Sequence, residues 1–321
     1  MLSRIFYYRG KLMNRWVFFL LLLIFAGQLM AEGNGGYAGA YLRIGLDARS
    51  LGMGNAQVAA ADHGFGFYYN PAALPFLEKF AANFSYSFLS LDRRFSYLGI
   101  SAPLKPQAGF SLGWIYSGVG DIQGYDSRGM ETDKINHGLH AIYFSFGIYI
   151  IPQKLSVGLN AKYLREGLSD PEFDYTGKGF GGDLGLYYRP LTDLRLGYQL
   201  KDLNAKLKSN TNNIFERGLE RDNEFPISQR IGFFYHTPVR WAWVAYDFEW
   251  STAGEEKHHF GLEFTIPGVA ARMGYDNDHL TFGAGLQIDK YLKLKAKLDY
   301  AFVTSVVDEG VSHVFSWQLA F

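Results

Sequence analysis

The sequence predicts an all-β fold, a transmembrane antiparallel β-barrel of about fourteen strands with an N-terminal hatch in its lumen. Three observations support this fold class. Apolar and polar residues alternate with a period of two, short turns alternate with longer polar loops, and the alternating runs are about 9–12 residues long. Soluble strands usually have ~5–6 residues, whereas a tilted strand needs about 9–11 residues to cross a bilayer.

The alternation is clearest in residues 292–302, where apolar side chains occupy the even positions and Lys293, Lys295, Lys297 and Asp299 the odd ones. A helix would scatter these lysines around its axis, but a strand places them all on one face. We therefore expect Leu294 and Leu298 to face lipid and Lys295 to face the lumen. The same pattern predicts strands near 80–90, 94–102, 108–118, 139–150, 155–165, 180–189, 194–202, 227–236, 241–250, 258–266, 269–275, 279–288, 291–302 and 311–321.

The strand ends and connections favour a membrane barrel over the alternative, a soluble β-sandwich, which needs no aromatic rims. Aromatic residues near strand ends predict interfacial girdles: Tyr116, Tyr149, Tyr163, Tyr188, Trp241, Trp250, Tyr275 and Tyr291. Short turns such as 103–106 and 267–268 alternate with longer loops at 119–137, 166–179, 203–226, 251–257 and 303–310. An even number of strands places both barrel ends on the short-turn side.

Composition excludes several classes of protein. The 321 residues are 48% hydrophobic and 17% aromatic, which excludes bulk disorder. The chain has no cysteine, so disulfides, thiolate nucleophiles and thiolate metal sites are excluded. Lys+Arg and Asp+Glu both total 31, so no net basic charge indicates nucleic acid as a partner.

Residues 1–31 have the pattern of a secretory signal peptide. Basic residues precede an apolar run at 16–25, and small Ala31 ends the segment. The alternative, a membrane-spanning helix, needs about 18–20 apolar residues, and Gly27 interrupts the run too early. Both Met1 and Met13 fit as the start. We expect export through this signal to the outer membrane of a Gram-negative-type cell.

Residues 32–79 break the alternation, and we expect them to form a hatch ahead of a barrel at 80–321. A barrel of about fourteen strands has room for such a segment. A buried guanidinium needs an anionic partner, so Arg49 should pair with an inward carboxylate, for which Asp247, Glu249 and Glu263 are the candidates.

Three motifs in this segment carry a resemblance to a known family. They are Arg49-Ser-Leu-Gly-Met-Gly54, the Ala-rich stretch to Asp62, and Asn70-Pro-Ala-Ala-Leu74. Their order resembles the FadL/PorV-type (PorV/PorQ-like) family of bacterial outer-membrane β-barrels. This chain departs from that family at two positions, because Asn55 and Ala73 stand where the family often has glycine. The resemblance implies a hatch or gate formed by Arg49, Gly52, Gly54, Asn70, Pro71 and Ala72. From the residues alone, Asn70-Pro71 also fits a helix N-terminus, limited to about one turn by Pro75.

No catalytic constellation, metal site or cofactor motif stands out, so we expect no enzyme and no cofactor. His258 and His259 are adjacent in a strand and point to opposite faces, and Asp276-Asn-Asp278 fits a polar loop better than a calcium loop. The expected lumen-lining residues are Arg195, Arg230, Asp247, Glu249, Glu263, Arg272, Lys293, Lys295 and Lys297. They form either an ion-paired polar wall or a cationic stripe near Arg272 and 293–297 that receives an anionic headgroup.

The resemblance implies two functions. The first is FadL-like passage of hydrophobic or amphipathic molecules across the outer membrane. The alternative is a PorV/PorQ-like component of a type IX protein secretion system, acting by protein–protein contacts through loops such as 119–137 and 203–226. The expected partners are outer-membrane lipids, a hydrophobic or amphipathic small molecule or a secretion-system protein, and the barrel-assembly machinery, whose C-terminal signal the final Phe321 resembles.

Overall fold

The computed structural model describes residues 37–169, 174–210, 220–288, 295–304 and 310–321. Residues 34–321 form one compact unit. The expected signal peptide lies outside the described residues, as do Tyr291, Lys293 and Leu294. Within the described part of the chain, no helix is long and apolar enough to cross a membrane.

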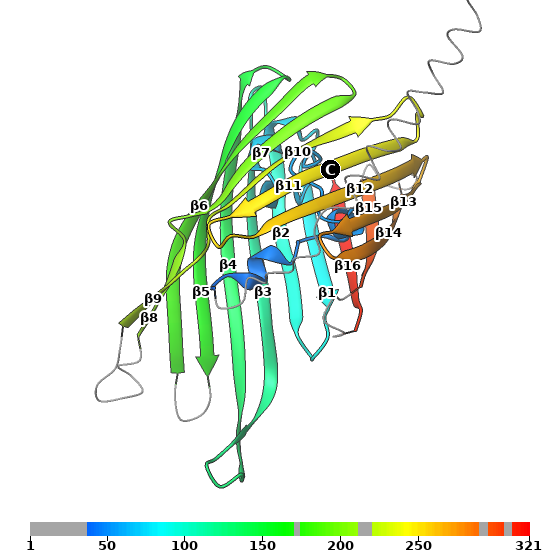
Figure 1. Ribbon diagram of the computed structural model, residues 1–321. Helices are drawn as coiled ribbons and strands as arrows, with labels where there is room; N and C mark the ends of the chain where they lie inside the picture. Colours follow the sequence, from blue (N-terminus) through cyan, green and yellow to red (C-terminus); the bar gives the residue numbers. More distant parts are fainter. Residues whose placement is uncertain (1–36, 170–173, 211–219, 289–294, 305–309) are drawn as a thin grey trace, which may run out of the picture. The chain divides into compact units, whose positions relative to one another are not determined.

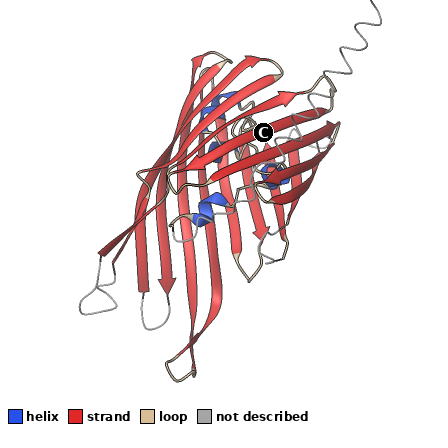
Figure 2. Ribbon diagram, in the orientation of Figure 1, coloured by secondary structure: helices blue, strands red, loops and turns tan. Residues whose placement is uncertain are grey.

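The strands close into an antiparallel β-barrel (Figures 1 and 2). The first strand pairs with the last, and β5 pairs with β6, so the ring has no open seam. Of the 16 strands among the described residues, β8 and β9 form a side hairpin on β6, which leaves fourteen in the ring. This confirms the predicted fold class.

The bounds of the ring strands agree with the predicted ranges at most ends. They are β1 (Ala81–Phe88), β2 (Arg94–Leu104), β3 (Ala108–Tyr125), β4 (Glu131–Ile151), β5 (Leu155–Ser169), β6 (Asp174–Leu191), β7 (Leu194–Leu203), β10 (Ser228–His236), β11 (Ala242–Ser251), β12 (Glu256–Ile266), β13 (Val269–Asp276), β14 (His279–Ile288), β15 (Lys295–Val303) and β16 (Ser312–Ala320).

The period of two separates an apolar outer face from a small or polar inner face. On β16, Phe315, Trp317 and Leu319 point outward, whereas Val314 and Ser316 are buried inside. Large exposed side chains cover the outer face of the other strands, including Leu98, Leu112, Ile142, Phe144, Leu184, Ile231, Met273 and Phe282. An apolar exterior on a closed ring is what a lipid environment requires.

Three of the predicted loops contain strands, so these loop predictions are wrong over much of their length. β3 and β4 continue through most of 119–137, and β5 and β6 take up most of 166–179. The predicted loop 203–226 contains β8 (Lys206–Asn210) and β9 (Glu220–Glu224), which project from the ring in Figure 1. These extensions have no regular alternation of apolar and polar residues, but the hydrogen-bond ladder between the strands continues through them.

The two ends of the barrel meet at one rim, as the even strand number predicts. The backbone N–H of Phe321 donates to the carbonyl of Phe80 at 2.9 Å. The short turns lie at the same rim. One aromatic assignment is wrong: Tyr149 points inward, and its hydroxyl donates to the carbonyl of Pro75.

Residues 37–80 lie against the inward faces of the strands. They contain four short helices: η1 (Ala40–Arg43), α2 (Ala48–Gly52), η2 (Gly66–Tyr68) and η3 (Pro71–Phe76). The main apolar core lies between this segment and the wall, where Phe67 packs on Tyr97 and Tyr143 with ring centroids 5.7 and 5.5 Å apart. We call residues 37–80 the N-terminal segment.

Candidate functional site

Arg49 forms the expected ion pair, and its partner is Glu263. Asp47 caps α2 by accepting from the backbone of Ser50, and the helix directs Arg49 toward β12. Nε and Nη2 of Arg49 donate to the two carboxylate oxygens of Glu263 at 2.9 and 3.1 Å. Arg272 donates to the same carboxylate at 2.6 Å. This bidentate, largely buried pair is the stronger kind of charge-assisted contact and fixes α2 to the wall.

The other two candidate carboxylates, Asp247 and Glu249, do not pair with Arg49 and make different contacts. Asp247 is fully buried on β11 and accepts from the backbone N–H groups of Gln57 and Val58 at 2.7 and 2.8 Å. Glu249 pairs with Arg230, and Arg230 also donates to a backbone carbonyl of the segment. The polar inner wall therefore forms hydrogen bonds with the backbone of the N-terminal segment as well as with its side chains.

Asn70 both caps a helix and anchors it. Its Oδ1 accepts from the backbone N–H of Ala72, which confirms the N-cap of η3, with Pro71 in the first turn. Its Nδ2 donates to the carbonyls of Val58 and Leu186 at 2.9 and 3.0 Å. The cap residue is fully buried and ties η3 to β6.

A row of inward-facing glycines lets η3 approach the strand backbones. Gly109, Gly147, Gly158 and Gly185 lie directly opposite one another on β3 to β6. A Cβ placed on Gly158 would lie 2.4 Å from the backbone nitrogen of Ala72. Glycine in a strand interior often marks such a close approach of another backbone. We call these four residues the glycine row.

Gly52 and Gly54 occupy equally close contacts on the other side of the lumen. A Cβ on Gly52 would come within 2.9 Å of the Cα of Gly283. Gly54 has a φ of +60°, and its N–H donates to the hydroxyl of Thr281 at 3.1 Å. A Cβ there would lie 2.5 Å from the carbonyl oxygen of Tyr275. Both positions require glycine for space, and Gly54 also for its backbone conformation.

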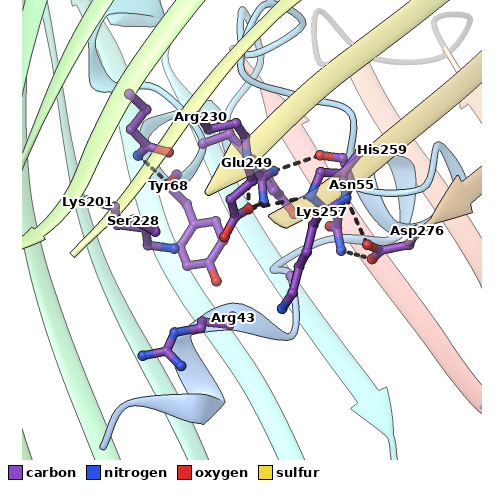
Figure 3. A pocket seen from close by; sticks show the side chains of 13 residues that line it. Arg43, Asn55, Tyr68, Lys201, Ser228, Arg230, Glu249, Lys257, His259 and Asp276 are labelled. Carbon is purple, nitrogen blue, oxygen red and sulfur yellow. Dashed lines mark hydrogen bonds and ion pairs between the residues drawn. The ribbon is translucent and has the colours of Figure 1, made fainter. Parts of the chain in front are cut away.

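A cavity of about 50 Å³ lies where the N-terminal segment meets the long-loop ends of the strands (Figure 3). Asp276, the last residue of β13, accepts from the amide of Asn55 and lies 2.8 Å from Nδ1 of His259. Of the predicted polar loop, Asn277 and Asp278 form the turn between β13 and β14, whereas Asp276 is the last residue of β13 and faces the lumen. We call this the loop-side cavity; its labelled lining residues are Arg43, Asn55, Tyr68, Lys201, Ser228, Arg230, Glu249, Lys257, His259 and Asp276.

A larger cavity of about 320 Å³ lies toward the short turns, and we call it the turn-side cavity. Apolar and charged side chains share its wall, with Arg195 paired to Asp62 at 2.6 Å. Its lining includes Arg49, Asp62, His63, Phe65, Arg195, Phe234, Trp243, Glu263, Ile266, Arg272, Leu286, Lys297 and Asp299. Such a volume and mixed lining are typical of small-molecule sites.

Among the titratable groups of the N-terminal segment, Asp47 and His63 line the turn-side cavity and have shifted pKa values. Burial raises the pKa of Asp47 to about 6, against the hydrogen bonds from Ser50 that lower it. Burial lowers the pKa of His63 well below its usual value, and the nearby charges of Arg49 and Lys297 lower it further. His63 is thus neutral at pH 7 and adds no charge to the turn-side cavity.

Most of the expected lumen-lining residues lie on the inner face of the barrel, where most of them form ion pairs. Arg272 is shared by Glu263 and Asp299, so it offers no free charge. Lys297 lines the turn-side cavity, and Lys295 lies on the same face of β15. Lys293, the third lysine of the expected stripe, lies outside the described residues. His258 and His259 point to opposite faces, as predicted.

The glycine row and the backbone contacts of Asp247 were not identified from the sequence. The signal was present, because glycines recur at inward positions such as 109, 147, 158 and 185. The alternation by itself indicates only that these glycines are small residues on the polar face of each strand. Their partner, the irregular segment before the first strand, has no period that would match it to a particular row.

No family model and no curated protein sequence matches this chain. Solved structures do. The P. putida toluene transporter TodX aligns with a TM-score of 0.60 at 16% identity, over 86% of this chain and 99% of that one. The Ralstonia pickettii toluene transporter TbuX gives 0.61 at 16% identity, over 86% and 98%. A Pseudomonas aeruginosa FadL homologue gives 0.60 at 10% identity, over 86% and 98%. The chain has the fold of these proteins.

Proposed function

We propose that this chain is a non-enzymatic outer-membrane channel that passes hydrophobic or amphipathic small molecules, with the N-terminal segment as its hatch. The observation that carries the proposal is the position of that segment. It contacts the inner wall between the loop-side and the turn-side cavity. The toluene transporters that share the fold support the same class of substrate. The apolar outer face of the ring supports a membrane location.

In this proposal the short-turn rim faces the periplasm and the longer hairpins face outward, the usual arrangement of bacterial outer-membrane barrels. A substrate entering from the outside meets Gln57 and Val58, held by Asp247, and α2, held by Glu263. Passage then requires these contacts to open or the segment to shift. The gate residues of the hatch are Arg49, Gly52, Gly54, Asn70, Pro71 and Ala72.

The turn-side cavity supports an apolar or amphipathic substrate. Phe234 and Trp243 stack with ring centroids 4.7 Å apart on one part of its wall. Buried Phe65 of the N-terminal segment adds further apolar surface. The charged residues around them are mostly compensated by partners, so the wall does not select for a strongly charged solute. We assign this cavity as the last site before release.

Uptake measurements test the proposal. The gene is expressed in cells without another hydrophobic-solute channel, and entry of a labelled monoaromatic hydrocarbon and of an alkyl amphiphile is followed. Expression should raise entry of at least one of them over cells carrying the empty vector. A deletion of residues 37–76 should leave a folded, heat-modifiable barrel with higher ion conductance. Entry equal to the vector control, with the barrel folded in the membrane, would refute the channel.

The PorV/PorQ-like role is the second candidate. One observation favours it: the β8–β9 hairpin projects from the ring and carries mainly charged residues, among them Lys206, Lys208, Arg221 and Asp222. Such a surface suits a protein partner. Loss of secretion of a partner protein on deleting the gene, with solute entry unchanged, would favour this role. The barrel-assembly machinery is a further proposed partner.

A further inference from the structure

Cationic side chains form a continuous row on the outer face of the barrel. Arg165 on β5 lies directly opposite Lys178 on β6, and Lys178 lies directly opposite Lys208 on β8. His140 on β4 lies directly opposite Arg165, and its Nδ1 accepts a hydrogen bond from the indole N–H of Trp114, so it is a polar neighbour of the row and not one of its cations. Directly opposite residues of antiparallel strands share a face, and Arg165, Lys178 and Lys208 are exposed. We call Arg165, Lys178 and Lys208 the cationic row.

The cationic row lies at the edge of an aromatic surface. Two residues further toward the short turns, each strand presents a large apolar side chain, namely Ile142, Tyr163 or Phe180. Tyr163 and Phe180 pack with ring centroids 5.3 Å apart, and Phe180 is 72% exposed. Two residues of a strand span roughly 7 Å. The charges therefore lie just outside the apolar belt, at the depth where lipid headgroups begin.

The described residues around the row compensate little of its positive charge. Among the described residues, no carboxylate forms an ion pair with Arg165 or Lys178. Lys208 has only Asp222, at 4.0 Å. Like charges directly opposite each other on neighbouring strands are unfavourable. An arrangement of this kind becomes favourable when an external anion lies between the cations.

The row is also local. The same line of opposite residues continues from His140 through Tyr116 on β3 to Ser96 on β2. It then runs through β1, β16 and β15, where it carries only uncharged residues: Tyr86, Phe315 and Tyr300. The cations are concentrated over β5, β6 and β8. A general attraction to a charged membrane would not require this concentration.

We propose that the cationic row binds the phosphate groups of an anionic lipid in the leaflet on the long-loop side, with the lipid's apolar part on the aromatic surface below. Arg165 offers the planar fork that matches phosphate oxygens, and the two lysines offer flexible point charges. Their long stems extend along the apolar surface while the charged ends reach the headgroups. This inference rests on the membrane location in the proposed function but not on transport.

The test compares lipid binding by two double variants. R165Q/K178Q removes two charges from the row, and K105Q/K154Q removes two exposed lysines from the short turns. Each protein is placed in nanodiscs of zwitterionic lipid, and native mass spectrometry follows binding of a phosphorylated glycolipid and of its dephosphorylated form. At about 1 kcal/mol for each charge near the surface, R165Q/K178Q should bind the phosphorylated lipid about 30-fold more weakly. K105Q/K154Q should bind it like the wild type.

Three outcomes would overturn the proposal: equal binding of both lipid forms by the wild type, unchanged binding by R165Q/K178Q, or an equal loss in K105Q/K154Q. Heat-modifiable mobility shows that each variant is folded. Inorganic phosphate is added as a competitor, and full competition at millimolar concentration would assign the row to a soluble anion instead of a lipid. Failure of solute uptake leaves this result unaffected, because the assay involves no transport.

Discussion

Substituting Gly158 tests whether the N-terminal segment is held by backbone contact with the strands. A Cβ at Gly158 would lie 2.4 Å from both the nitrogen of Ala72 and the carbonyl carbon of Pro71. Ordinary contacts begin near 3.4 Å, so η3 and β5 must separate by the difference, 3.4 − 2.4 = 1.0 Å. Both neighbouring atoms belong to the backbone, so no side chain can rotate away. Overpacking of this kind destabilises by about 1–3 kcal/mol.

The matched control is Gly167→Ala on the same strand, where a Cβ meets nothing within 4 Å. Replacing glycine at an unstrained site stabilises by about 0.4–1 kcal/mol. The two variants should therefore differ by about 1.5–4 kcal/mol in the free energy of unfolding, measured by tryptophan fluorescence in urea with the protein in lipid vesicles. Gly158→Ala should also raise the conductance of single channels in planar bilayers, because the segment is displaced.

Equal stability and equal conductance of Gly158→Ala and Gly167→Ala would refute the reasoning. That result would mean that the segment does not contact the glycine row in the membrane. A large loss of stability without a change in conductance would retain the contact but would reject a role for it in closing the lumen.

Three further predictions concern single contacts. Glu263→Gln leaves Arg49 and Arg272 without their shared carboxylate and should destabilise the folded barrel by about 3–5 kcal/mol in the same urea assay; Glu263→Asp should recover part of this. Asn70→Ala removes the N-cap of η3 and should cost about 1–2 kcal/mol, with a larger effect on solute entry than on refolding yield if the hatch proposal holds. Leu298→Arg should cost about 2–4 kcal/mol in vesicle refolding if it lies near the bilayer midplane, whereas Lys295→Leu should be mild; the reverse order would mean that the face assignment of β15 is wrong.

The face of each strand was predictable because burial in lipid imposes a strict period of two. This rule correctly places Leu298 and Trp317 outside and Lys297 and Asp299 inside. The rule fails where neither face meets lipid. The ends of β3 and β4 beyond Val119 lie outside the apolar belt, so their residues keep the ladder but lose the pattern.

The position of Tyr149 shows a second limit. An aromatic residue near a strand end fits an interfacial girdle, but the parity of β4 turns Tyr149 toward Phe76, with ring centroids 4.8 Å apart. Whether a residue occupies an odd or an even position along its strand is the safer guide to its face, since residue type alone does not distinguish a lipid interface from a packed interior. The choice of Glu263 among three carboxylates was likewise open, because it depends on the height of α2 in the lumen, which strand patterns do not determine.

The pairing of β1 with β16 has a consequence for how the protein is made. These neighbours are joined over a sequence separation of more than two hundred residues, with Ala81 opposite Ala320. Until the last strand is present, the sheet has two free edges with unpaired backbone groups, a state that invites aggregation and that hydrocarbon does not tolerate. Closure must therefore come late and form slowly, as long-range pairings do. The nine residues of β16 thus decide when the ring closes and the molecule becomes resistant to unfolding.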